Sequence, residues 1–254
     1  MRRGVMVRAI ALVLAAALIL CGCHQSGGNG PVTEQLPQRL TPQEAYIAQF
    51  SQGAPAGFWA RNDRGNGSPF NCSFRRDNVL IADGVLTLQL NQTSEGFAGA
   101  EYRSQSRYGY GFYSVKMKAA SCSGVISSFF LYCGRPWDEI DIEFLGNDTT
   151  KVQFNYYTKG KGGHEYVYDL GFDASTDFHE YAFDWQPDSI TWYVDGKAVY
   201  KATDNIPATP GNIMMNIWNV ADSNAQWAGK FDDSQLPVWA QYQWIGYQSA
   251  AEDA

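Results

Sequence analysis

The sequence predicts an all-β protein, an antiparallel β-sandwich of the jelly-roll type. Short segments in which apolar and polar residues alternate recur from residue 50 to residue 248, separated by Gly, Asn, Asp and Pro. Such alternation is typical of strands that bury one face. No helical segments separate the strands, as the crossovers of a parallel sheet would require. Composition stays uniform over residues 43–249 and shows no internal repeat, which indicates one domain.

The expected strands follow one another at short intervals along the chain. They cover residues 79–82, 85–90, 110–118, 125–132, 139–144, 151–157, 166–170, 179–186, 190–194, 197–201, 213–218 and 239–248. The dipeptides Asp83-Gly84 and Asp195-Gly196 each lie between two of these segments and favour hairpin turns. Residues 125–132 contain few polar side chains, which predicts a buried strand. Only residues 41–49 are predicted as a short helix.

The N-terminus has the pattern of a bacterial export signal. Arg2, Arg3 and Arg8 precede an apolar run over residues 9–20, which is shorter than the roughly 20 residues of a membrane span. Residues 20–23, Leu-Cys-Gly-Cys, are similar to a lipobox and predict lipid attachment at Cys23, with plain signal-peptidase cleavage as the alternative. We therefore expect an exported protein, anchored in a bacterial cell envelope or otherwise secreted.

The chain then divides into three further parts. Residues 24–42 are rich in Gly, Gln and Pro and are predicted to be a flexible linker, residues 43–249 form the main domain, and residues 250–254 are a tail. Cys72, Cys122 and Cys133 remain in the main domain, so an odd number leaves at least one unpaired. No Cys or His spacing indicates a metal site, and His164 and His179 are interpreted as loop or surface residues.

The net charge and the aromatic content indicate which class of molecule the protein binds. The formal net charge is −7 and the pI about 4.9, which argues against nucleic acid as a partner. Aromatic residues make up 15% of the chain, including eight Trp and fifteen Tyr. Such side chains can stack on the flat apolar faces of sugar rings, although many of them can equally fill a sandwich core.

Three acids alternate with apolar residues in one predicted strand. Glu139, Asp141 and Glu143 then project from one face, whereas Ile140 and Ile142 pack behind them. Neighbouring carboxylates repel one another, and this repulsion can keep one group protonated while another stays ionised. Hydrolysis of a glycosidic bond requires such a pair, at a separation that differs between retaining and inverting enzymes. A solvent-exposed strand or a calcium site are the alternatives, and the sequence pattern alone fits either stereochemical course.

The flanking residues carry a resemblance to a known family. The stretch over 137–146, Trp-Asp-Glu-Ile-Asp-Ile-Glu-Phe-Leu-Gly, resembles the active-site strand of glycoside hydrolase family 16 in its E-x-D-x-E form. The similarity extends over residues 148–157, 170–174, 181–187, 192–196, 206–207, 209–211 and 213–219 and covers roughly residues 50–248. Within the family, these stretches are most similar to bacterial lichenases, the endo-1,3-1,4-β-glucanases.

The resemblance implies a jelly roll with a substrate cleft on its concave sheet and retaining double-displacement hydrolysis. Glu139 would be the nucleophile, Asp141 its assisting acid, and Glu143 the general acid and then the general base. Trp137 would stack on the sugar nearest the cleaved bond. The other residues expected to bind substrate are Asn66, Glu101, Arg103, Phe130, Tyr132, Asn155, Tyr157, Asn216 and Trp218.

Some of these residues also have a structural interpretation. Phe130 can belong to the core, Tyr157 can fill a sandwich edge, and Arg103 can merely neutralise Glu101. The chain departs from the lichenase pattern in the short loop over residues 133–136, in residues 220–229, and near Gly99, where the usual disulfide partner of Cys72 is absent. Gln243 replaces an aspartate that often binds structural calcium, so calcium binding is weakened and no cofactor is required.

The expected function is endo-hydrolysis of mixed-linkage β-1,3-1,4-glucan by a monomer. A related specificity is the first alternative: xyloglucan, β-1,4-glucan or laminarin, with hydrolysis or transglycosylation, because the short loop borders the cleft. A surface lipoprotein that binds carbohydrate without turnover is the second. The intact set of Glu139, Asp141 and Glu143 argues against the second alternative.

Overall fold

The computed structural model describes residues 28–250. The predicted signal peptide over 1–23, with its lipidation site Cys23, therefore lies outside the described residues, as do residues 251–254. Within the described part of the chain, no helix is both long and apolar enough to span a membrane.

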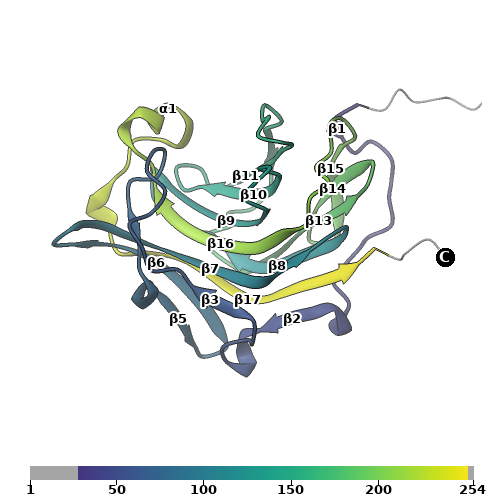
Figure 1. The fold of residues 1–254 in the computed structure, drawn as a ribbon. Helices are drawn as coiled ribbons and strands as arrows, with labels where there is room; N and C mark the ends of the chain where they lie inside the picture. The colour runs from purple at the N-terminus through teal and green to yellow at the C-terminus, as the bar shows by residue number, and fades with distance from the viewer. Residues whose placement is uncertain (1–27, 251–254) are drawn as a thin grey trace, which may run out of the picture.

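The fold is a sandwich of two antiparallel layers, stacked with β9 and β16 above and β5 and β17 below in Figure 1. The concave layer has the order β3 (Phe58–Ala60), β7 (Gly96–Tyr108), β16 (Gly211–Asn219), β9 (Val125–Tyr132), β10 (Glu139–Leu145), β11 (Lys151–Tyr157) and β12 (Tyr166–Asp169). The convex layer has the order β5 (Val79–Ala82), β6 (Val85–Thr93), β17 (Val238–Ser249), β8 (Gly111–Lys118), β13 (His179–Gln186), β14 (Ser189–Val194), β15 (Lys197–Ala202) and β1 (Gly30–Pro31).

Short elements complete the layers. β2 (Tyr46–Gln49) pairs with β17, β4 (Ser73–Phe74) runs parallel to β7, and β6 continues into β7, which links the two layers. The α-helix α1 (Ala225–Ala228) has a single turn. The 3₁₀ turns are η1 (Gln43–Ala45), η2 (Phe50–Gln52), η3 (Arg76–Asn78), η4 (Asp222–Asn224) and η5 (Asp233–Gln235). The predicted all-β jelly-roll class is confirmed.

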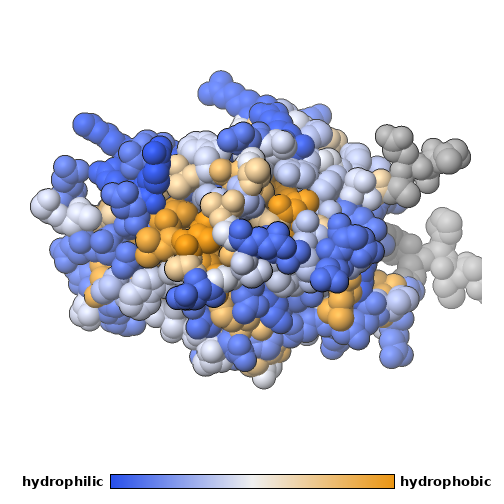
Figure 2. Space-filling model, turned by 90° about the horizontal axis from the view of Figure 1, so that it is seen from below, coloured by the Kyte–Doolittle hydropathy of each residue, from blue (hydrophilic) through white to orange (hydrophobic). Residues whose placement is uncertain are grey.

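Successive side chains of β10 point alternately to the core and to the cleft, as the sequence predicts. Ile140, Ile142 and Phe144 are buried between the layers, where they meet aromatic side chains of the convex layer such as Trp185 and Trp192. The outer side of the convex layer is mainly hydrophilic with scattered apolar areas (Figure 2). The three acids of β10 therefore project to the other side of the concave layer, away from the core.

The prediction of a short helix in the N-terminal part is only partly right. Residues 41–49 form no α-helix. Only the 3₁₀ turn η1 is helical, because the segment β2 that follows pairs with β17, and pairing within a sheet overrides weak helix propensity. Residues 29–41, predicted as part of a flexible linker, lie against the convex layer. Arg39 forms an ion pair with Asp184, and the Thr41 amide donates to the Glu180 carboxylate at 2.9 Å.

Candidate active site

A cavity of about 870 Å³ lies on the concave layer. Glu139, Asp141 and Glu143 line it together with every residue that the sequence predicts to bind substrate. These are Asn66, Glu101, Arg103, Phe130, Tyr132, Trp137, Asn155, Tyr157, Asn216 and Trp218. The structure therefore brings the predicted site residues into one place, although it does not by itself assign their roles.

Strand register explains why these residues meet. Directly paired residues form three rows across the concave layer, and each row contains one of the three acids. The rows are Asn212–Tyr132–Glu139–Tyr157, Trp59–Arg103–Met214–Phe130–Asp141–Asn155, and Glu101–Asn216–Ser128–Glu143–Gln153. Because paired residues point to the same face of a sheet, each acid has its row neighbours beside it in the cavity.

Burial is the main cause of the raised pKa values of Glu139 and Glu143. Burial raises the pKa of Glu139 to about 7, opposed by a hydrogen bond from Trp137 and reinforced by the charge of Glu143. Burial likewise raises the pKa of Glu143 to about 7, opposed by a hydrogen bond from Gln153 and reinforced by Glu165. Each glutamate thus has one neutral donor, which favours its ionised form.

Asp141 lies between the two glutamates and is itself buried. Burial, followed by the charges of Glu139 and Glu143, raises the pKa of Asp141 well above its ordinary value. The backbone carbonyl of Asp141 accepts a hydrogen bond from the indole of Trp192, at 3.2 Å, which fixes this part of β10 against the convex layer. We expect Asp141 to hold a proton while one of the glutamates beside it is ionised.

Trp137 is held at the mouth of the cavity by the short loop that precedes it. Its backbone is left-handed, with φ of 40°, and its carbonyl accepts a hydrogen bond from Gly160 at 2.8 Å. Its ring stacks on Tyr157, with centroids 4.9 Å apart, and its indole N–H donates to Glu139 Oε2 at 2.6 Å. Trp137 therefore orients the carboxylate of Glu139 as well as offering an exposed ring to a sugar.

Asp138, next to Glu139, points away from the cavity and joins three segments. Its buried carboxylate accepts hydrogen bonds from the backbone amides of Lys159, Ala208 and Thr209, at 2.7, 3.1 and 3.0 Å. Burial alone would raise the pKa of Asp138, but these donors lower it. Asp138 thus connects the start of β10 to the turn after β11 and to the loop before β16.

We expect Asp138→Ala to lower the free energy of unfolding by about 3 kcal/mol, because three backbone amides lose their charged, buried acceptor. Urea unfolding at neutral pH measures this change, with Asp138→Asn, which keeps one carbonyl acceptor, as the milder control. Because the folded-state pKa of Asp138 is lowered, its contribution is complete above the unfolded-state pKa and disappears as the pH falls through the folded-state value. A loss in Asp138→Ala that is unchanged in acid would contradict this account.

Gln153 connects Glu143 to the segment that contains α1. Its side-chain N–H₂ donates to Glu143 Oε2 at 2.9 Å, and its carbonyl oxygen accepts from the indole of Trp227 at 3.1 Å. Gln153 is buried. Because the Trp227 indole can only donate, it requires the carbonyl end of the amide and leaves the N–H₂ end for Glu143.

We expect Gln153→Leu to shift the alkaline limb of the kcat/KM profile to higher pH. The limb reports the group that must be protonated, which the family resemblance implies is Glu143, and the Gln153 donor lowers the pKa of Glu143. Removal of the donor therefore raises this pKa and keeps the acid protonated at higher pH. Trp227→Phe should move the limb in the same direction by less. A limb that stays in place or moves to lower pH in Gln153→Leu would rule out this role.

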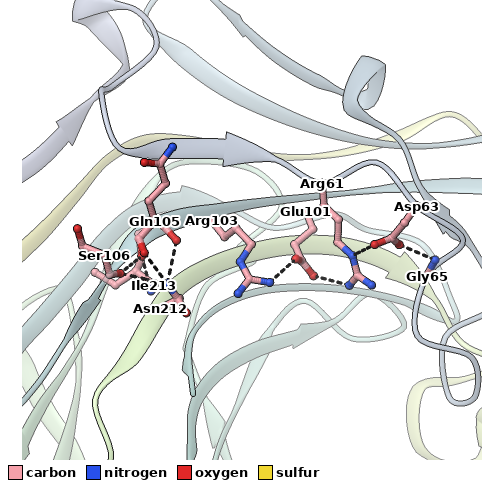
Figure 3. A network of polar contacts seen from close by, with 10 residues as sticks. Arg61, Asp63, Gly65, Glu101, Arg103, Gln105, Ser106, Asn212 and Ile213 are labelled. Atoms are coloured by element: carbon pink, nitrogen blue, oxygen red, sulfur yellow. Dashed lines mark hydrogen bonds and ion pairs between the residues drawn. The ribbon is translucent and has the colours of Figure 1, made fainter. Parts of the chain in front are cut away.

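The buried carboxylate of Glu101 contacts two arginines in the part of the cavity beside β3 and β7 (Figure 3). One oxygen of Glu101 lies 3.2 Å from Arg61 and the other lies 3.5 Å from Arg103, while Arg61 also contacts Asp63 at 2.6 Å. Burial raises the pKa of Glu101 although both guanidinium groups oppose this. Arg103 thus shares the neutralisation of Glu101 with Arg61, and its guanidinium still lies on the cavity wall.

The structural interpretations of the aromatic residues hold only in part. Phe130 and Trp218 are buried, as core residues would be, yet both line the cavity. Tyr157 stacks on Trp137 at the cavity mouth rather than filling a distant edge. Among the described cysteines, Cys72, Cys122 and Cys133 are all free, and a Cβ at Gly99 would lie 2.9 Å from the sulfur of Cys72.

The sequence prediction missed several cavity residues. Gln153, Ser128 and Met214 each lie two residues from a predicted site residue on the same strand, so period-two spacing could have found them. Trp59, Arg61 and Asp63 come from β3 and the segment after it, which was not predicted. The remaining members are Ser68, Pro69, Phe70, Glu165, Asn224 and Trp227.

Comparison with known proteins supports the similarity inferred from the motifs. The family model described as glycosyl hydrolases family 16 matches residues 66–237. A β-glucanase of Paenibacillus polymyxa is 54% identical over 198 residues, which cover 75% of this chain and 82% of the relative. A β-glucanase of Acetivibrio thermocellus is 48% identical over 214 residues, which cover 82% of this chain but only 62% of the relative.

Solved structures agree with this similarity. A prokaryotic β-1,3-1,4-glucanase (lichenase) derived from a mouse hindgut metagenome superposes with a TM-score of 0.76 at 48% identity, and the match covers 80% of this chain and 98% of that structure. The two layers described above therefore have a solved counterpart at 48% sequence identity.

Proposed function

The chain belongs to family 16 of the glycosyl hydrolases, and we propose that it is a retaining endo-β-glucanase that cleaves β-1,4 bonds in mixed-linkage β-1,3-1,4-glucan. The observation that carries the proposal is the presence of Glu139, Asp141 and Glu143 on three adjacent rows of one cavity lined by aromatic and amide side chains. The substrate assignment is supported by relatives named β-glucanase and lichenase.

In the proposed reaction, the ionised Glu139 attacks the anomeric carbon, and Glu143 donates its proton to the departing glycosidic oxygen. The Trp137 N–H occupies Oε2 of Glu139 and leaves Oε1 to form the bond. Glu143, now ionised, next takes a proton from water, and the resulting nucleophile cleaves the glycosyl ester on Glu139. Two inversions give net retention of the β-configuration.

Asp141 acts by holding a proton between the two glutamates in this scheme. A protonated Asp141 adds no negative charge beside Glu139 when that carboxylate approaches the substrate. As Glu139 loses its charge on forming the ester, Glu143 can ionise with less repulsion. The negative charge thus moves from Glu139 to Glu143, whose proton leaves on the departing oxygen, and two adjacent carboxylates are not ionised together.

Product profiles on a substrate panel test the proposed function. Barley β-glucan, lichenan, xyloglucan, carboxymethylcellulose and laminarin are incubated with the purified protein, and reducing sugars and product lengths are measured. We expect rapid release of short oligosaccharides from barley β-glucan and lichenan, and little from the others. Faster cleavage of xyloglucan or laminarin would instead favour the related specificity, for which the short loop before Trp137 is the specific observation.

Export and assembly are further parts of the proposal. An export signal with a lipobox-like Leu-Cys-Gly-Cys supports a bacterial cell-envelope lipoprotein attached through Cys23, with secretion as the alternative. Incorporation of a labelled fatty acid into the wild type but not into Cys23→Ala is the expected result.

We also propose that the protein is a monomer, which size-exclusion chromatography with light scattering tests. We propose that no cofactor is required and expect no structural calcium at Gln243, so that thermal unfolding should be the same with calcium and with a chelator.

A further inference from the structure

Trp59 has an exposed ring in the cavity that the proposed reaction leaves unused. It lies on the three-residue edge strand β3, its side chain is 41% exposed, and it lines the cavity. Its neighbour Phe58 points to the other side of the layer and packs against the core. An aromatic ring needed only for packing would be covered in the same way, whereas Trp59 presents apolar surface to the cleft.

The register places Trp59 far from the reacting bond but in line with it. Trp59 is the last member of the row that contains Asp141, and β7, β16 and β9 lie between β3 and β10. Four steps between neighbouring strands correspond to roughly 19 Å. A sugar residue at Trp59 is therefore separated from the cleaved bond by further sugar residues of the same chain.

The surroundings of Trp59 supply polar groups of the kind that hydroxyls require. The guanidinium of Arg103 lies over the Trp59 ring, 5.3 Å from its centroid. Glu101 lies between Arg103 and Arg61, and each of its carboxylate oxygens contacts one of the two guanidinium groups (Figure 3). Arg103 has five N–H donors, and the single contact to Glu101 leaves the others to bind hydroxyl groups.

We propose that Trp59, with Arg103 beside it, forms an outer subsite that binds a glucosyl residue of the β-glucan chain remote from the cleaved bond. The apolar face of the sugar stacks on the face of the indole that Arg103 does not cover, and the free N–H groups of Arg103 donate to hydroxyl groups of the adjoining part of the glucan chain. This inference rests on the proposed β-glucanase function and adds a determinant of substrate length to it.

A length series of mixed-linkage β-glucan oligosaccharides tests the inference. We measure kcat/KM for each length with the wild type, Trp59→Ala, Trp59→Phe and Trp239→Ala. Trp239 is the matched control, since it is 48% exposed but lies on β17 of the convex layer. In the wild type, kcat/KM should rise by about tenfold at the length that first reaches Trp59, the size expected for an aromatic stacking contact with its buried area.

Trp59→Ala should lose this rise and keep the wild-type rate on shorter oligosaccharides, Trp59→Phe should keep part of the rise, and Trp239→Ala should keep all of it. A rise retained in Trp59→Ala would overturn the inference. An equal loss at every length would also overturn it, because the residue would then act only on the fold. Activity of the wild type on the shorter oligosaccharides tests the proposed function separately, since its absence would contradict that function rather than the subsite alone.

Discussion

Replacement of Glu139 by Ala should lower kcat/KM on barley β-glucan roughly 10⁴-fold or more, the scale of loss seen when one member of a catalytic set is removed. The variant lacks the carboxylate that attacks the anomeric carbon in the proposed reaction. No other carboxylate lies beside it in its row, since its paired neighbours are Tyr132 and Tyr157. Reducing-sugar release under initial-rate conditions measures the change.

The loss in Glu139→Ala should not depend on the leaving group. An aryl β-glucan oligosaccharide with an acidic phenol needs no proton for departure, yet it still needs the nucleophile. Glu165→Gln is a suitable control for the charge of the cavity, because Glu165 lines the cavity and is exposed. Activity of Glu139→Ala within tenfold of the wild type would remove Glu139 from the role of nucleophile.

Replacement of Glu143 by Gln should lower kcat/KM on barley β-glucan by about 10²–10⁴-fold, the usual contribution of general acid catalysis. The amide keeps the volume of the side chain and can still meet Gln153, but it cannot donate a proton to the glycosidic oxygen. The alkaline limb of the pH profile, assigned to the Glu143 carboxyl, should disappear with it.

Substrates with an acidic leaving group distinguish the proposed role of Glu143 as general acid from that of Glu139 as nucleophile. With an acidic phenol as leaving group, Glu143→Gln should recover much of the rate of the first step, and the glycosyl-enzyme should accumulate because the base for the second step is missing. A burst of phenol followed by slow turnover, together with a mass shift on the peptide that contains Glu139, is the expected observation. If the leaving group makes no difference to Glu143→Gln, Glu143 is not the general acid.

The sequence predicted most strands of the cleft because alternation is strong where one face meets the core. Residues 125–132, 151–157 and 179–186 form β9, β11 and β13 with the predicted bounds. β7 was not predicted, although it is the longest strand. Small residues such as Ala98 and Ala100 occupy its core side, and Glu101 and Arg103 occupy its cleft side, so hydrophobic alternation is weak.

The strength of the local alternation also explains which site residues the sequence prediction missed. The three acids stand out because charge alternates with Ile140 and Ile142 on a regular strand. Trp59 and Arg61 belong to an edge segment whose position is set by pairing with β7, and pairing over such a separation leaves no local signal. Gln153 obtains its role from Trp227 on a distant segment, which only the folded chain brings within 3.1 Å.

The anomeric configuration of the first product tests the central claim most directly. Proton NMR spectra recorded during the first minutes of barley β-glucan hydrolysis distinguish the two anomers before mutarotation mixes them. Attack by Glu139 followed by water predicts that the β-anomer forms first and the α-anomer appears only later, because two inversions occur at the same carbon. Initial formation of the α-anomer would contradict the account, since it requires direct attack by water and leaves no covalent role for Glu139.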